Sequence, residues 1–512
     1  MSNLSDLLPS GGGSKSAEFV ASGTLPNGQA VILNSNGTVT AVGTSTQTVP
    51  IAVPTGSVTA FTSDTLTYSD VSWDGSTGHF VIVWKDSANS NYGTARIGTV
   101  AGNVITFSST TYVFNSERTN APTVEVDPNT PGKFVIVWGY STGSQFKGIV
   151  GNYTGTGTSA SMTFGSVFLV ANIDPPDYVA LAYDKNTAGR FVVMFQGPTN
   201  AGQGVCGNIA SGATTVTMGS VVTWASQGSA PHPKYVMSIY YDKTADKFIT
   251  PFGDGANSNA LNAIVGTISS TDTLTFGTRT TSSITNTGLM EIAGDPLRTN
   301  SSVIAYAQSG PASALVATLS GTTVSFGTPA AFSAAGTYRV TAMMGSGTQD
   351  IGGLMWVELI GGSNYVRAST FTVSGTSLSI GTTYNMTAGD GSGSPNYLSS
   401  DFNPAQSGQF VGAYYDAVLT DGVTQLGQLL VGSQQTTNLT TTNFVGMPDA
   451  AYSSGATATV ALPGGISLNQ TSLTIGSTYF VQDNGTLGTS AGTVNVEAGR
   501  AISATSLLIK GI

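Results

Sequence analysis

Hydrophobic and polar residues alternate along most of this chain, in short runs separated by turns rich in Gly, Asp and Asn. β-Branched and aromatic residues at every second position are typical of strands. One hairpin pattern recurs seven times: an apolar strand, a turn, and a second apolar strand that usually begins with Phe. A unit of about 55 residues made only of strands predicts the blades of a β-propeller. The register residues of the copies are Phe80, Phe134, Phe191, Phe248, Val303, Leu354 and Phe410.

Each full repeat contains four predicted strands, and the last repeat lacks an obvious fourth one. Residues 52–61 form a spare strand before the first repeat, where Phe61 precedes Val71 by ten residues, just as Phe114 precedes Val124. We therefore expect residues 52–61 to complete the blade whose other strands lie in 397–433. Sharing a blade between the two ends of the array would remove its open sheet edges. The pattern thus predicts an all-β fold, a seven-bladed propeller of four-stranded blades.

The segments on either side of the propeller resemble one another. Asn36-Gly37 and Asn484-Gly485 each lie between two apolar strands. The Asn-Gly dipeptide favours tight hairpin turns. The two ends are therefore expected to form one small β module that flanks the propeller. The predicted boundaries are 17–50 for the N-terminal β module, 51–433 for the propeller and 434–512 for the C-terminal β module.

Two short segments are candidates for assembly contacts. Residues 1–16 divide into a peptide and a Gly-rich linker, and the peptide is either disordered or a docking element that inserts Leu7 and Leu8 into a neighbouring subunit. The apolar run near the other end, Leu507, Leu508 and Ile509, is expected to be part of a sheet and to contribute to assembly.

The composition excludes several classes of function. Only 9% of residues are charged and the net charge is −10 with 17 Lys and Arg, so a nucleic-acid groove is not expected. The single cysteine allows no intrachain disulfide, and the sequence shows neither a secretory signal nor an apolar run that could insert into a membrane. Such a low charge suggests a surface of hydroxyls and amides, or one covered by partner subunits.

One aspartate recurs at the turn of the hairpin. Its side chain can accept a hydrogen bond from the backbone two residues later, which makes an Asx-turn. A glycan-binding or calcium loop is the alternative, but no DxDxDG-type loop occurs. His79 and His232 are both expected to be solvent-facing loop residues. Because they lie in different repeats, no zinc site is predicted, and no other cofactor is expected. The recurring residues are Asp74, Asp127, Asp184, Asp242 and Asp295.

Signals for catalysis are few, and the protein is predicted not to be an enzyme. A glycosidase needs two facing carboxylates, and Glu125 and Glu291 lie in the first strand of their repeats, where both could face the central channel. Paired carboxylates there would favour an enzyme. No serine lies on a strand-to-helix elbow, and Cys206 has no histidine partner, so it is expected to be a small buried filler.

Aromatic residues concentrate in or beside the first two strands of the repeats. Packing between blades is one explanation, and a stacking platform for sugars at the loop face is the other. As candidate glycan-binding residues we take aromatic and amide side chains in or near loops: Trp73, Asn91, Tyr92, Tyr140 and Tyr365.

The two ends of the chain carry a resemblance to a known family. The segment MSNLSDLLPSGGGSKSAEFVASGTLPNGQAVILNSNGTVTAVG resembles the N-termini of virion structural proteins of tailed bacteriophages, particularly those of marine cyanobacteria. The segment from FVGMPDAAYSSGATATVAL to AGRAISATSLLIKGI resembles the closing part of phage tail-fibre and capsid-appendage proteins. The resemblance covers about 110 residues and implies an oligomeric structural subunit of the virion, without active-site residues.

These observations lead to one principal hypothesis and two alternatives. The principal hypothesis is a tail fibre, spike or tail-associated appendage, made in the host cytoplasm and exposed on the particle. It would assemble with other virion proteins as a trimer or larger homo-oligomer and present the propeller to host-surface polysaccharide, with weak contacts multiplied by avidity. The alternatives are a capsid decoration or head fibre without a receptor role, and a glycan-cleaving propeller enzyme.

Overall fold

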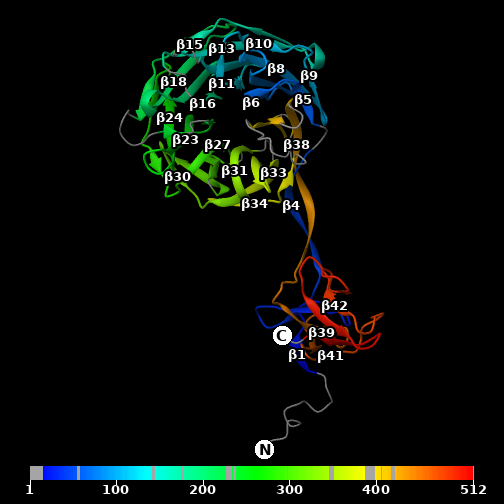
Figure 1. Ribbon diagram of the computed structural model, residues 1–512. Coiled ribbons are helices and arrows are strands. Elements are labelled where there is room, and N and C mark those ends of the chain that lie inside the picture. Colours follow the sequence, from blue (N-terminus) through cyan, green and yellow to red (C-terminus); the bar gives the residue numbers. More distant parts are fainter. Residues whose placement is uncertain are drawn as a thin grey trace, which may run out of the picture. The chain divides into compact units, whose positions relative to one another are not determined.

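The computed structural model describes residues 15–54, 58–140, 145–173, 178–225, 233–234, 238–296, 298–308, 310–344, 351–386, 398–404, 406, 408–416 and 421–510. Leu7, Leu8 and His232 lie outside these ranges. The chain divides into two compact units: Pro50–Val431 forms one, and the segments before and after it form the other. The described residues are almost entirely β-strand (Figure 1), with short 3-10 turns at η2 (Gly157–Ser159) and η3 (Pro198–Asn200). None of the described helices is long and apolar enough to cross a membrane.

In the larger unit, antiparallel sheets surround a central axis as the seven blades of a propeller (Figure 1). Blade 1 contains β6 (Leu66–Asp74), β7 (His79–Asp86), β8 (Tyr92–Ala101), β9 (Val104–Phe107) and β10 (Tyr112–Asn115). Blade 2 contains β11 (Thr119–Val126), β12 (Lys133–Tyr140), β13 (Gln145–Thr154), β14 (Ser161–Phe164) and β15 (Phe168–Ala171). Blade 3 contains β16 (Val179–Tyr183), β17 (Arg190–Gln196), β18 (Gly202–Ile209), β19 (Val216–Met218) and β20 (Val222–Ala225).

The remaining blades follow the same plan. Blade 4 contains β21 (Pro233–Lys234), β22 (Tyr240–Asp242), β23 (Lys247–Asp254), β24 (Ala260–Ile268), β25 (Leu274–Phe276) and β26 (Thr280–Thr281). Blades 5 and 6 share the long strand β31 (Ala330–Met344). Blade 5 also contains β27 (Thr287–Gly294), β28 (Ser301–Gln308), β29 (Pro311–Ser320) and β30 (Thr323–Phe326). Blade 6 also contains β32 (Gly352–Ile360), β33 (Ser363–Ser374), β34 (Ser377–Ile380) and β35 (Tyr384–Asn385). Blade 7 contains β36 (Ser399–Phe402), β37 (Gln409–Asp416), β38 (Asp421–Thr437), β4 (Thr44–Pro54) and β5 (Thr59–Thr62).

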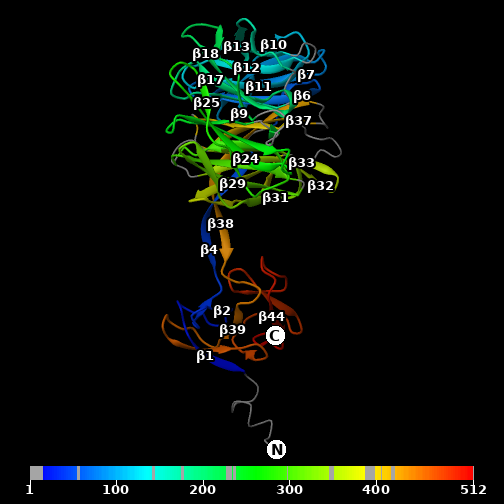
Figure 2. The same ribbon diagram turned by 90° about the vertical axis from the view of Figure 1, so that its left-hand side faces the viewer.

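The ring closes as the sequence predicts, through strands donated by the N-terminal side of the propeller. In each blade the third strand pairs with two consecutive outer pieces, for example β8 with β9 and then β10. In blade 7 these pieces are β4 and β5, which both pair with β38; Thr62 lies opposite Gly422 and Ala60 opposite Val423. Figures 1 and 2 show β4 and β38 side by side. Since the donated strands fill the outer position of blade 7, β38 is covered by outer strands as the third strand of every other blade is.

A Phe–Gly pair explains the recurring Phe of the repeat. The Phe ring of the second strand lies over a glycine directly opposite in the third strand, where any side chain would clash: a Cβ at Gly98 would lie 2.1 Å from the Phe80 ring. Blade 6 exchanges the two partners, because Gly352 lies in the second strand and Phe371 opposite it in the third. The predicted register residues Val303 and Leu354 are therefore wrong: Ser302 and Gly352 occupy the Phe position. The pairs in which the Phe ring lies over the glycine are Phe80–Gly98, Phe134–Gly151, Phe191–Gly207 and Phe410–Gly427. In blade 4 Phe248 lies opposite Gly266 in register, but the ring nearest to Gly266 is that of Phe276.

Neighbouring blades are held together by aromatic pairs, so the packing interpretation of the tryptophans holds. Phe114, on the outer strand of blade 1, packs edge-on against Trp138 of blade 2 with ring centroids 5.2 Å apart. Phe61 of the donated strand β5 makes the same contact with Trp84 at 5.1 Å, so the closing seam repeats an ordinary junction between blades. Both tryptophans are fully buried. Each such pair adds about 0.5–1.5 kcal/mol to the burial of its rings.

The smaller unit is built from both ends of the chain, as predicted. Its first sheet has the order β1-β40-β39-β2-β3 and its second sheet has the order β41-β45-β44-β42-β43. The first contains β1 (Ser16–Val20), β2 (Val31–Leu33), β3 (Val39–Ala41), β39 (Phe444–Pro448) and β40 (Thr457–Ala461). The second contains β41 (Ile466–Ser467), β42 (Thr478–Val481), β43 (Leu487–Gly488), β44 (Glu497–Ala501) and β45 (Leu507–Ile509).

These two sheets are two copies of one five-stranded motif, because their strand orders correspond one to one. The β2–β3 and β42–β43 hairpins turn at Gly37 and Gly485, both with φ of 82°, and in each the preceding Asn side chain accepts a bond from the following Thr amide. Gly446 and Gly499 mark the same bulge, with φ of 149° and 152°. The second copy is contiguous in sequence, whereas the propeller interrupts the first between β3 and β39. The propeller is thus an insertion in the first copy.

Candidate functional site

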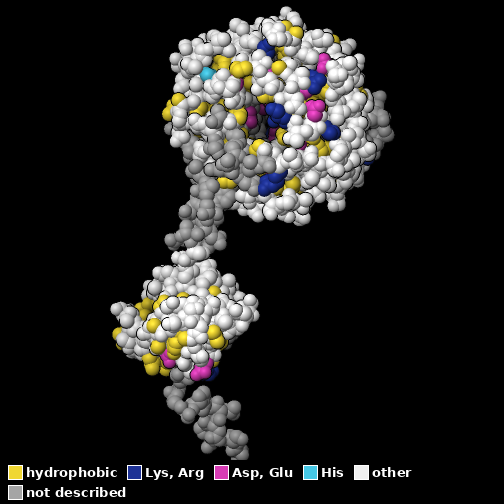
Figure 3. Space-filling view, turned by 180° about the vertical axis from the view of Figure 1, so that it is seen from behind, with side chains coloured by type: hydrophobic (Ala, Val, Ile, Leu, Met, Phe, Trp, Pro, Cys, Tyr) yellow, Lys and Arg dark blue, Asp and Glu magenta, His cyan; other side chains and the backbone are white. Residues whose placement is uncertain are grey.

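The first strands of the blades surround a central cavity of about 340 Å³, the candidate site of the propeller. Figure 3 shows this face of the propeller hollowed at its centre, with basic and acidic side chains in and around the opening. A cavity of this size lies near the lower end of the range of small-molecule sites, about 300–1,000 Å³. Its lining includes the acidic residues Asp70, Glu125, Glu291 and Asp401, the basic residues Lys185 and Arg339, and the tyrosines Tyr68, Tyr178 and Tyr240. Both glutamates predicted from sequence therefore face the same cavity.

The two aspartates of the cavity connect neighbouring blades. Asp70 accepts hydrogen bonds from the backbone amide of Val71 and from that of Val124 in the next blade, each at 3.0 Å. Asp401 of blade 7 accepts from the amide of Trp73 in blade 1 at 2.8 Å. These amides lie on the open inner edge of the first strands, where no further strand can pair with them. Both carboxylates therefore satisfy backbone donors across a blade junction.

The two glutamates lie beside serine hydroxyls. Ser72 Oγ lies 3.3 Å from Glu125 Oε2 and accepts the amide of Val126 at 3.0 Å. Ser238 Oγ donates to Glu291 Oε1 at 3.0 Å and accepts the amide of Ile292 at 3.0 Å. In these two positions the serine accepts the amide of the neighbouring strand, and the glutamate accepts a bond from the serine hydroxyl.

The pKa values of all four carboxyl groups are raised above their ordinary values. Burial raises the pKa of Glu291 to about 8, assisted by the negative charge of Asp70, and raises the pKa of Asp70 to about 7. Burial likewise raises the pKa of Asp401 to about 6, because backbone hydrogen bonds offset part of the desolvation. The pKa of Glu125 lies well above its usual range, mainly through burial and then through Asp401. At neutral pH the cavity therefore contains both hydrogen-bond donors and acceptors.

A lysine balances part of this negative charge. Lys185 follows the turn aspartate of blade 3, and its Nζ lies 5.1 Å from the centre of the Tyr240 ring. Burial lowers the pKa of Lys185, while the charges of Glu125 and Asp401 counteract this effect. Within the described ranges, no group of three or more His, Cys, Asp and Glu residues is placed to hold a metal ion. The lining thus combines carboxyl groups, basic side chains and tyrosine hydroxyls.

The turn aspartates are structural, which confirms the Asx-turn prediction. Asp74 Oδ1 accepts the amide of Ser76 at 2.9 Å, and its Oδ2 accepts the amide of Gly132 in the next blade at 2.7 Å. Asp127 likewise accepts from Asn129 in its own turn and from Gly189 in blade 3. These carboxylates are buried. Each thus closes its own turn and fastens it to the following blade.

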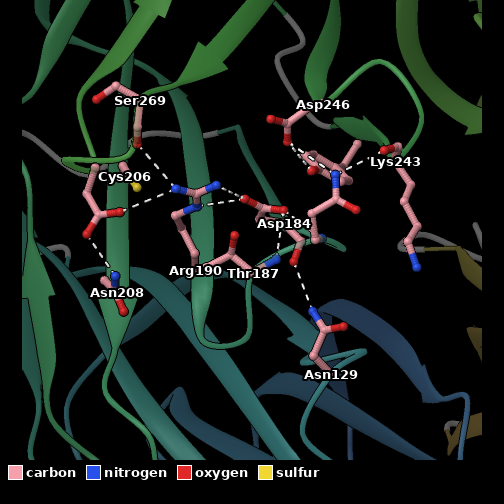
Figure 4. A network of polar contacts seen from close by, with 12 residues as sticks. Asn129, Asp184, Thr187, Arg190, Cys206, Asn208, Lys243, Asp246 and Ser269 are labelled. Atoms are coloured by element: carbon pink, nitrogen blue, oxygen red, sulfur yellow. Dashed lines mark hydrogen bonds and ion pairs between the residues drawn. The ribbon is translucent and has the colours of Figure 1, made fainter.

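Figure 4 shows the turn aspartate of blade 3, Asp184, which also pairs with an arginine. Asp184 accepts the amides of Asn186 and Thr187 and pairs with the guanidinium of Arg190. Arg190 also donates to the carbonyl of Ser269 in blade 4 at 3.2 Å. Cys206 lies nearby in the core, and burial raises the pKa of its thiol to about 12, which agrees with a structural filler.

His79 and Trp73 are not surface residues, which corrects two expectations. His79 lies in β7, is only 4% exposed, and packs its ring 5.3 Å from that of Tyr153. Trp73 is 5% exposed, and its Nε1 donates to the carbonyl of Asp401 at 3.2 Å. Its ring is part of the core at the closing seam and therefore presents no face to a sugar.

The other predicted glycan-binding residues lie away from the cavity, near connections between second and third strands. Asn91 and Tyr92 are half-buried at the β7–β8 turn of blade 1. Tyr365 lies in β33 of blade 6 with the Arg367 guanidinium 5.9 Å from its ring centre, and Tyr140 ends β12 of blade 2. None of them lines the central cavity. Their role in binding stays a prediction.

Sequence reasoning missed Asp70, Asp401 and Lys185. A usable signal was present, because Asp70 and Glu291 lie four residues before their turn aspartates, and Glu125 lies two residues before Asp127. Alternate residues of a strand face the same side, so polar residues two and four positions before the turn share the channel face.

A scan against protein-family models gives no match, and no curated protein matches the sequence. Among solved structures, the BP39L lectin from Burkholderia pseudomallei aligns with a TM-score of 0.51 at 10% identity, covering 72% of this chain and 98% of the lectin. Sqt1 from Saccharomyces cerevisiae gives 0.40 at 11% identity, with 74% and 99% covered. A protein from Lactobacillus plantarum gives 0.46 at 10% identity, with 67% and 98% covered. At such low identity the similarity to the lectin supports the propeller fold alone.

Proposed function

We propose that this protein is a structural appendage of a tailed-bacteriophage virion whose propeller binds carbohydrate of the host surface in its central cavity. The observation that carries the binding site is the cavity itself, where four carboxyl groups, Lys185 and tyrosines surround about 340 Å³. Sugars present many hydroxyls and few charges, and carboxyl and hydroxyl side chains satisfy such ligands while aromatic rings pack on their apolar faces. The resemblance of both chain ends to phage structural proteins supports the virion assignment, and the lectin-like fold is compatible with it.

The experiment is binding of purified protein to whole host cells and to extracted surface polysaccharide, with bound protein and released sugar both measured. Glu125→Gln and Glu291→Gln alter the cavity without changing the size of the side chains. We expect each to weaken retention by up to about tenfold, since a hydrogen bond to a neutral group contributes about 0.5–1.5 kcal/mol. Glu117→Gln is the matched control, because Glu117 is an exposed propeller residue that does not line the cavity.

The outcomes separate the alternatives. Retention that survives both cavity variants but is lost on Asn91→Ala or Tyr92→Ala would move the site to the loops of the rim. Absence of retention on every host fraction would contradict the receptor role and favour a capsid decoration or head fibre, which antibody labelling of particles would locate.

The same cavity also favours a glycan-cleaving enzyme as the second candidate function. A general acid and a partner carboxylate with different proton affinities are what glycoside hydrolysis requires, and the pKa of Glu291 is raised to about 8 while that of Asp401 is raised only to about 6. Release of reducing sugar that Glu291→Gln abolishes would establish this alternative. The prediction from sequence that the protein is not an enzyme would then be wrong.

A further inference from the structure

The four carboxyl groups of the central cavity form two pairs that differ in their charged neighbours. Burial raises the pKa of Glu125 and of Asp401, and the positive charge of Lys185 lowers both. Burial also raises the pKa of Asp70 and of Glu291, but here the charged neighbours are acidic: Asp401 acts on both groups, and Asp70 acts on Glu291. The first pair therefore lies beside a cation, and the second pair lies beside further negative charge.

Lys185 shows how this cavity accommodates an ammonium group. Its Nζ lies 5.1 Å from the centre of the Tyr240 ring. Burial lowers the pKa of Lys185, and the negative charges of Glu125 and Asp401 raise it. Both kinds of neighbour stabilise an ammonium group, because the face of an aromatic ring carries negative charge and a carboxylate accepts strong hydrogen bonds. The cavity thus already contains one example of an ammonium group bound by carboxylates and a tyrosine ring.

Two hydroxyl groups of the cavity lining lack a hydrogen-bond partner. Ser399 and Tyr183 line the cavity and are buried, with exposed fractions of 8% and 1%. Among the residues that the structure describes, neither Ser399 Oγ nor Tyr183 Oη has a partner. Burial and then the charges of Asp127 and Glu125 raise the pKa of the Tyr183 hydroxyl, and Glu125 lines the same cavity. Buried hydroxyls are almost always paired in native proteins, so these two indicate a polar ligand.

We propose that the central cavity binds an amino sugar with a free ammonium group, and that Asp70 and Glu291 balance the charge of this group as Glu125 and Asp401 balance that of Lys185. The inference rests on the proposed binding of carbohydrate and names the class of sugar. The cavity is lined by four acidic and two basic side chains, so a cation reduces its net negative charge and an anion increases it. The hydroxyls of the sugar pair with Ser399 and Tyr183.

The first test compares two disaccharides that differ only at C2: the β-1,4-linked glucosamine dimer, which carries free amines, and cellobiose, which carries hydroxyls there. Isothermal titration of the full chain at about pH 6, where sugar amines are protonated, measures both affinities. We expect the glucosamine dimer to bind about tenfold or more tightly, because a hydrogen bond between charged groups is about twice as strong as a neutral one. Equal affinities would overturn the inference while leaving carbohydrate binding in place. Equally tight binding of cadaverine, an amine without a sugar ring, would overturn the assignment to a sugar.

The second test locates the ammonium group. Glu291→Gln keeps the size of the side chain but removes its charge, so it should weaken binding of the glucosamine dimer about tenfold and that of cellobiose by less than about threefold. Glu117→Gln, outside the cavity, should leave both affinities unchanged. Circular dichroism and thermal unfolding would verify that both variants fold. Equal weakening of the two sugars by Glu291→Gln would contradict a charge contact at this residue.

The third test is the proton balance of binding. Burial and acidic neighbours raise the pKa of Glu291 to about 8, and burial raises that of Asp70 to about 7, so both are largely protonated at about pH 6. A bound ammonium group stabilises their ionised forms, so the glucosamine dimer should release protons and cellobiose should not. Titrations in two buffers of different ionisation enthalpy measure this release. Glu125, Asp401, Lys185 and Arg339 also line the cavity, so Glu291→Gln should reduce the release without abolishing it. The absence of proton release with the glucosamine dimer would overturn the proposal.

Discussion

The propeller and the terminal unit are both repeats, but only the propeller closes on itself. Its seventh blade takes two strands from the opposite end of the array, and Phe61 packs on Trp84 as Phe114 packs on Trp138. The terminal unit has two copies and one junction, and the outer apolar face of its first copy is covered by Leu25 and Tyr452 of the same chain. A repeat array is completed when its last unit meets its first, as in the propeller, or when its end units are capped by other parts of the chain.

The largest expected effect tests the closure of the ring. Phe61→Ala removes a fully buried ring from the seam, and Phe114→Ala removes its equivalent from an ordinary junction. We expect each to reduce the free energy of unfolding by about 3–5 kcal/mol, measured by urea denaturation. A much smaller effect of Phe61→Ala would show that the seam contributes little and that the ring is effectively open.

The turn aspartates test how firmly the blades are fastened to each other. Asp74→Ala leaves the amide of Gly132 and the hydroxyl of Tyr153 without their acceptor, at a cost of about 2–4 kcal/mol. Asp449→Ala is the control in the terminal unit, because Asp449 is exposed and its carboxylate accepts a bond from Tyr452 within its own loop. This change should alter stability by less than about 0.5 kcal/mol. Equal effects would contradict the structural role of the turn aspartate.

The carboxyl groups of the central cavity make the stability of the propeller fall as the pH rises. The pKa of Glu291 is raised from 4.5 to about 8, so its contribution to stability is fully present below about pH 4.5 and is lost as the pH rises to 8. Between pH 5 and pH 8 the free energy of unfolding should therefore fall by on the order of 3 kcal/mol less in Glu291→Gln than in the wild-type protein. Unfolding free energies at pH 5 and pH 8 for both proteins measure the difference. A decline of the same size in the variant would contradict the assignment to Glu291.

The smallest effect compares the two hairpins of the terminal unit. Gly37 and Gly485 share a φ of 82°, so Ala is strained at both by about 1 kcal/mol. A methyl group at Gly37 would meet no atom within 4 Å, whereas at Gly485 it would lie 2.4 Å from the carbonyl oxygen of Val42. Gly485→Ala should therefore lower the melting temperature distinctly more than Gly37→Ala. Equal shifts would argue against the contact between the copies.

The architecture could be predicted from sequence because it repeats. Phe61 marked the donated strand by its distance from Val71, and the two Asn-Gly turns marked the terminal unit. The exchange of Gly352 and Phe371 escaped detection, because only strand pairing shows that a missing Phe is replaced from the opposite strand.

The candidate site could be predicted from the sequence only in part. Glu125 and Glu291 were placed correctly on the channel face by strand position alone. Trp73 was misjudged because its closeness to a turn says nothing about Asp401 of blade 7, more than 300 residues away, which accepts bonds from both its backbone amide and its indole. Leu507 and Ile509, expected at an assembly contact, are buried in the core of the terminal unit, and only Leu508 between them is partly exposed.

The insertion of the propeller between β3 and β39 also imposes an order on synthesis. A ribosome produces β1, β2 and β3 first, but their partners β39 and β40 emerge only after the last blade. The first sheet of the terminal unit therefore cannot form on a truncated chain. If this unit joins the molecules, only chains made to full length present a finished joining surface, and incomplete products are kept out of the assembly by their own topology.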